Sequence, residues 1–237
     1  MTPPQHSAAT VATPDGAMPA QLWLPPSGTG PGLVLVQEIF GVSSYIQQRG
    51  ADLAELGYVV LAPELYWRLP DAAIDFTRED VLQQGMALAG RADWDSAVAD
   101  TRLAFQQLAT WPQVTGGVGL IGFCYGGGLA FNVAALEEPA VLVSYYGSAL
   151  PNLLGLSGQV TAPSLHHFGS ADAFIAPDQV QEIKEAVTTR PNVLFETYAG
   201  ANHAFDNNTM PALFHAEASS AAWENTVAFL ARELPVP

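Results

Sequence analysis

The segment Gly122-Phe-Cys-Tyr-Gly126 contains the single cysteine of the 237 residues. It follows an apolar run and precedes a helical pattern, so it fits a G-x-C-x-G version of the sharp turn that holds a catalytic nucleophile between a strand and a helix. A lone cysteine is often a small buried hydrophobic residue. Here the strand–turn–helix context favours Cys124 as a nucleophile, with the backbone N–H of Tyr125 facing a developing oxyanion.

A competing motif overlaps this turn, because Gly117-Val-Gly119-Leu-Ile-Gly122 matches the dinucleotide pattern G-x-G-x-x-G. That pattern needs its glycines after a strand and at the opening of a helix. Here the glycines lie inside the apolar strand itself, and the chain beyond them is short for a dinucleotide fold. We therefore favour the nucleophile turn and expect no nucleotide cofactor.

Two later loops carry the partners that a cysteine nucleophile needs. Asp172 follows the apolar run that ends at Phe168, and His203 follows the run that ends near Tyr198. In α/β-hydrolases the acid and the histidine follow the nucleophile in this order. His203 would accept the thiol proton, and Asp172 would orient the imidazole. Asp206, three residues after His203, is the alternative orienting acid.

The elements that would position these residues alternate between apolar strands and amphipathic helices, which is typical of a parallel sheet flanked by helices. We expect a single α/β domain over residues 1–237, with residues 1–15 poorly ordered and Gln21–Leu24 as an early edge strand. Buried strands are expected at 32–37, 58–62, 117–123, 140–145, 164–168 and 193–198. Helices are expected at 45–56, 93–108, 128–136, 178–187 and 216–230, and loops at 25–32 and 69–77.

Composition narrows the choice of partners. The formal net charge of −15 would repel nucleic acid and anionic membranes. The N-terminal residues show no secretory signal pattern and no apolar run is long enough to span a bilayer, so we expect a cytoplasmic protein. His166 and His167 lie in a strand pattern with no metal-ligand spacing around them, so no metal is expected. The partner would be a small molecule, and the protein a monomer or a small homo-oligomer.

At these residues the sequence resembles the dienelactone hydrolase family of α/β-hydrolases, the carboxymethylenebutenolidases. The resemblance covers most of the chain and rests on Gln37–Gly41, Ala62–Tyr66, Gly122–Gly128, Tyr145–Gly147, Asp172 and Gly200–Phe205. It implies that Glu38 helps to activate the thiol, that the N–H of Ile39 is the second oxyanion donor, and that Phe40 and Tyr145 line the pocket. An aromatic residue in a strand such as Tyr145 is, however, more often packed in a core.

The sequence departs from the family where two arginines hold the substrate carboxylate. The corresponding positions are approximately Gln83 and Asn207, and the nearby Arg78 is out of register. We therefore expect a cofactor-independent hydrolase of a less anionic carboxylic ester or lactone. An acyltransferase on the same fold, or a binding module without catalysis, are the alternatives.

Overall fold

The computed structural model describes residues 3–237, whose strands form one eight-stranded sheet in the order β1-β2-β4-β3-β5-β6-β7-β8. Strands β3 to β8 run parallel, while β1 and β2 are antiparallel to their neighbours. The strands are β1 (Gln5–Thr13), β2 (Gly16–Leu24), β3 (Gly30–Val36), β4 (Val59–Pro63), β5 (Val114–Phe123), β6 (Leu142–Tyr145), β7 (Ser164–Gly169) and β8 (Val193–Tyr198). This arrangement confirms the predicted α/β fold.

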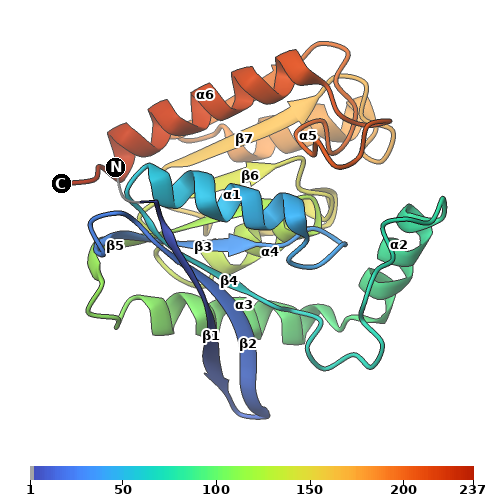
Figure 1. The fold of residues 1–237 in the computed structure, drawn as a ribbon. Coiled ribbons are helices and arrows are strands. Elements are labelled where there is room, and N and C mark those ends of the chain that lie inside the picture. Colours follow the sequence, from blue (N-terminus) through green and yellow to red (C-terminus); the bar gives the residue numbers. More distant parts are fainter. Residues whose placement is uncertain (1–2) are drawn as a thin grey trace.

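Helices cover the sheet, with α1 in front of it and α4 behind it in Figure 1. The helices are α1 (Ser44–Glu55), α2 (Val81–Arg91), α3 (Trp94–Leu108), α4 (Tyr125–Ala134), α5 (Pro177–Val187) and α6 (Ala216–Glu233), with short 3-10 turns η1 (Leu150–Asn152) and η2 (Leu154–Leu156). The central strands β3, β4, β6 and β7 are buried along their whole length. Such continuous burial is expected of parallel strands covered on both faces.

The N-terminal hairpin differs from the expectation of poor order over residues 1–15. Residues 1 and 2 lie outside the described part, but Gln5–Thr13 forms β1 and pairs with the whole of β2. The turn residues are Pro14 and Asp15, and β2 begins at Gly16, whose φ of 139° is readily adopted by glycine. Val11 and Met18 are buried, and the His6 ring stacks on Trp23. The Asp15-Gly16 pair is a hairpin signal that the predominantly small and polar residues around it obscured.

Helix α2 is the other element that the predicted helices did not include. It stands away from the sheet in Figure 1 and has only sparse contacts with the other helices and strands. The predicted loop at 69–77 is present and leads into it. Gly85 seats α2 on the segment after β3, because a Cβ there would lie 2.8 Å from the Phe40 ring.

Candidate active site

The turn between β5 and α4 holds Cys124 in a conformation that few side chains adopt. Its φ is 52° and its ψ is −116°, a strained backbone of the kind that gathers at functional sites. A Cβ at Gly122 would lie 2.1 Å from the Gly126 carbonyl oxygen, and one at Gly126 would lie 2.3 Å from the Val36 carbonyl oxygen. The glycines are therefore required by backbone packing, as the sequence pattern predicts.

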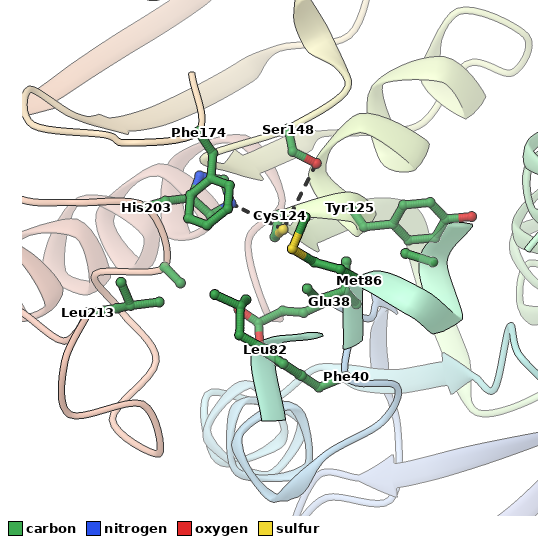
Figure 2. A pocket seen from close by; sticks show the side chains of 13 residues that line it. Glu38, Phe40, Leu82, Met86, Cys124, Tyr125, Ser148, Phe174, His203 and Leu213 are labelled. Atoms are coloured by element: carbon green, nitrogen blue, oxygen red, sulfur yellow. Dashed lines mark hydrogen bonds between the residues drawn. The ribbon is translucent and has the colours of Figure 1, made fainter. Parts of the chain in front are cut away.

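Cys124, His203 and Asp172 lie in one hydrogen-bonded chain at the carboxyl edge of the sheet. The Cys124 Sγ lies 3.1 Å from His203 Nε2, and His203 Nδ1 lies 2.8 Å from Asp172 Oδ2. Figure 2 shows the imidazole facing the thiol beneath the Phe174 ring. Asp172 is itself fixed, because its Oδ1 accepts the backbone N–H groups of Phe174 and Ile175. The parallel strands bring these side chains together from loops far apart in the sequence.

The electrostatics of this chain favour a charged imidazole. Burial alone lowers the pKa of His203, but interactions with the Cys124 sulfur and the Asp172 carboxylate outweigh it and raise that pKa to about 10. An imidazole with a raised pKa is a stronger acceptor for the thiol proton. A thiolate is the reactive form of cysteine. The Ser148 hydroxyl, 3.9 Å from Sγ, is a further polar neighbour of the sulfur.

Asp206 has other partners than the imidazole. Its fully buried carboxylate accepts two hydrogen bonds from the Arg49 guanidinium, at 2.9 and 2.8 Å, and others from Tyr45 and Ser219. The Arg49 guanidinium also lies over the Trp223 ring, so this cluster joins α1, α6 and the histidine loop. This geometry favours Asp172 over Asp206 as the orienting acid.

Glu38 lies in the same cavity as a buried carboxyl group. Burial raises its pKa to about 8, although His203 and a hydrogen bond from Asn207 act in the opposite direction. Asn207 Nδ2 donates to Glu38 Oε2 over 2.8 Å, while Oε1 has no hydrogen-bond partner within residues 3–237. The raised pKa favours the protonated form of the Glu38 carboxyl group at neutral pH.

A cavity of about 240 Å³ opens above Cys124. Of the residues singled out from the sequence, Glu38, Ile39, Phe40, Tyr125, Cys124 and His203 line it. Tyr145 does not: it is fully buried and bonded to Thr226 and the Ala222 carbonyl, so it packs in the core. Gln83 and Arg78 are exposed, and Arg78 pairs with Asp80. Asn207 lies behind Glu38 and reaches the cavity only through that carboxyl group.

Sequence reasoning missed most of the cavity wall. The further lining residues are Leu82, Met86, Ala89, Ser148, Phe174, Ala204 and Leu213. Leu82, Met86 and Ala89 share one face of α2, and their i, i+4, i+7 spacing was a usable signal. Phe174 and Leu213 lie in loops, where no periodicity marks an apolar residue that faces a ligand.

A mostly parallel sheet, a cysteine in a strained strand-to-helix turn and a histidine after the last strand together define an α/β-hydrolase. Residues 18–234 match the Dienelactone hydrolase family. The chain belongs to this family and is a hydrolase of carboxylic ester or lactone bonds. Within residues 3–237, no helix is long and apolar enough to cross a membrane.

The similar proteins carry consistent names. The chain is 36% identical to a carboxymethylenebutenolidase of Pseudomonas sp. (strain P51), over 93% of this chain and 92% of that protein. It is 34% identical to a carboxymethylenebutenolidase of Pseudomonas putida, over 87% and 88% of the two chains. A crystal structure of a putative dienelactone hydrolase from Klebsiella pneumoniae superposes with a TM-score of 0.83 at 25% identity, over 98% of this chain and all of that one.

Proposed function

We propose that the protein hydrolyses uncharged carboxylic esters or lactones through Cys124, with His203 as general base and Asp172 as its orienting acid. The observation that carries this proposal is the continuous chain from sulfur to imidazole to carboxylate at the floor of a cavity. Each member lies within hydrogen-bond reach of the next, which is the arrangement expected of an activated nucleophile.

The reaction begins when the Cys124 thiol gives its proton to His203 and the sulfur attacks the carbonyl carbon. The backbone N–H groups of Ile39 and Tyr125 hold the resulting oxyanion. Tyr125 is the first residue of α4, so its N–H has no acceptor within the helix. Collapse of the intermediate breaks the ester bond, and His203 returns the proton to the leaving alkoxide. A water molecule, deprotonated by His203, then hydrolyses the thioester.

Glu38 assists the nucleophile in this proposal rather than replacing His203. The imidazole, not the Glu38 carboxyl group, contacts the sulfur. Because its pKa is raised to about 8, Glu38 becomes a proton acceptor only at the alkaline end of the range. Its contribution should therefore appear as a change in kcat/KM near pH 8 that glutamine at this position abolishes.

The preference for an uncharged substrate rests on the charges around the cavity. Among the 13 described residues that line it, none is Lys or Arg. Asn207 already donates to Glu38, and Arg78 is exposed and paired with Asp80. A substrate carboxylate would lose its hydration without gaining a bidentate cationic partner.

The test compares four single substitutions in folded protein. Cys124→Ala and His203→Ala should each lower kcat for an activated ester by about a thousandfold or more, and Asp172→Asn somewhat less. Asp206→Asn is the matched control, since its carboxylate also lies near the histidine loop but bonds Arg49. More than a tenth of wild-type kcat in either alanine variant would refute the assignment. A larger loss of kcat in Asp206→Asn than in Asp172→Asn would show that Asp172 is not the orienting acid.

A further inference from the structure

Exposed apolar side chains gather where the cavity opens. Large hydrophobic residues that face solvent in the described part of the chain include Met86, 53% exposed, and Phe174, 46% exposed, and both also line the cavity. Phe76, which is 44% exposed, lies with its ring 6.0 Å from that of Phe40, a lining residue. We call these three residues the apolar rim: Phe76, Met86 and Phe174.

The inner part of this rim is a helix face. Leu82, Met86 and Ala89 lie on the side of α2 that borders the cavity, and in Figure 2 the Leu82 and Met86 side chains lie over Glu38 and Cys124. Because Gly85 rests against Phe40, the helix is held at a fixed distance from the segment after β3. The face spans about 10 Å along the helix axis. It continues the wall of the reaction cavity outward into solvent.

The cavity itself is small. Its volume of about 240 Å³ lies below the roughly 300–1,000 Å³ that is usual for ligand pockets. An ester whose acyl or alcohol part exceeds this volume can extend past Met86, a lining residue that is 53% exposed, and over α2. Methionine suits such a place, because its flexible thioether adapts to apolar groups of different shape. The absence of Lys and Arg among the described lining residues favours an arm without charge.

We propose that the preferred substrate is an ester or lactone with an unbranched apolar arm longer than the cavity, which lies against the α2 face Leu82–Ala89 and the apolar rim. This inference rests on the proposed function. The alternative occupant of the rim is a second copy of the chain. Continuity of the rim with the wall beside Cys124 favours the substrate arm.

The experiment measures kcat/KM for two ester series below the concentration at which they self-associate. One series lengthens the acyl group of an aryl ester from acetyl to octanoyl, and the other lengthens the alcohol of an alkyl acetate. Removing one methylene from water is worth roughly a fourfold gain at full burial. In at least one series, kcat/KM should therefore rise about two- to fourfold for each methylene until the arm leaves the rim.

Substitutions then locate the arm. Met86→Ser should lower the octanoyl-to-acetyl ratio, or its alcohol-side equivalent, by about five- to tenfold, and Met86→Leu should restore it. Leu136→Ser is the matched control, because Leu136 is 49% exposed but lies outside the cavity. This control should leave the ratio unchanged.

Several outcomes would overturn the inference while leaving the proposed function intact. These are hydrolysis with no chain-length dependence in either series, or a dependence that Met86→Ser does not alter. A wild-type dimer in sedimentation that Met86→Ser dissociates would assign the rim to a second copy. A folded wild-type protein that turns over no ester of either series would instead refute the proposed function.

Discussion

Replacing Glu38 with glutamine should make the stability of the protein less dependent on pH. Glu38 is 1% exposed, and its pKa rises from the usual 4.5 to about 8 on folding. The folded protein thus keeps a proton that the unfolded chain releases across this interval. The Glu38 contribution to stability is fully present below pH 4.5 and is lost as the pH rises through 8. Glutamine, an isostere of the protonated carboxyl group, does not titrate.

The size of this stability difference follows from the interval between the two pKa values of Glu38, 4.5 and about 8. For each pH unit between 4.5 and 8, the free energy of unfolding of the wild type falls by about 1.4 kcal/mol relative to that of the variant. At pH 7 the accumulated difference is about 3 kcal/mol. Glutamine can also keep the hydrogen bond from Asn207, because its side-chain oxygen can replace the Glu38 Oε2 that accepts it. The free energy of unfolding of Glu38→Gln minus that of wild type should therefore increase from pH 5 to pH 8.

Urea denaturation at half-unit pH steps measures this difference directly. Titration of every other group is common to both proteins and largely cancels in the subtraction. Glu55→Gln removes a carboxylate from the exposed end of α1 and serves as the control for loss of negative charge. The difference in free energy of unfolding between Glu38→Gln and wild type could stay constant between pH 5 and 8, or match the difference for Glu55→Gln. Either result would refute the conclusion that the buried Glu38 carboxyl group is protonated.

Three further predictions concern the loop, the turn and the substrate. Asp206→Asn should destabilise the protein by about 3 kcal/mol, because it leaves the Arg49 guanidinium without its buried partner; an unchanged urea midpoint would contradict this. Gly126→Ala should abolish activity and lower the thermal midpoint, since its Cβ would meet the Val36 carbonyl oxygen at 2.3 Å; wild-type turnover in a folded variant would show that the turn is less constrained. A neutral ester should exceed a carboxylate-bearing analogue of the same size by at least about tenfold in kcat/KM, and Arg78→Ala should not change that ratio. An anionic preference that disappears in Arg78→Ala would show that this arginine binds substrate.

The sequence was most informative where backbone geometry dictates residue type. The glycines around Cys124 and the apolar strands that precede Cys124, Asp172 and His203 were readable because close packing and continuous burial leave few alternatives. The carboxyl edge of a parallel sheet then brings the three side chains together. The sequence order of the three residues predicted that they meet, whereas the distances between them depend on how the loops pack.

The cavity wall was less predictable because its residues obey no local rule. Tyr145 and Phe40 are both aromatic residues at or after a strand end, yet only Phe40 reaches the cavity, while Tyr145 bonds to α6. Asn207 occupies an expected position along the chain, but it points at Glu38 instead of a substrate site. Which way such side chains face is decided by tertiary packing.

The proposed triad and the α2 residues that line the cavity belong to different parts of the fold, and this has a consequence for protein engineering. Cys124, Asp172 and His203 depend on strand ends, whereas Leu82, Met86 and Ala89 belong to a helix with sparse contacts to other elements. Substitutions on that face disturb little of the core, so they should cost little stability. A combinatorial library confined to these three positions would vary the cavity wall while leaving the proposed triad unchanged, and activity selection alone could find variants for new esters.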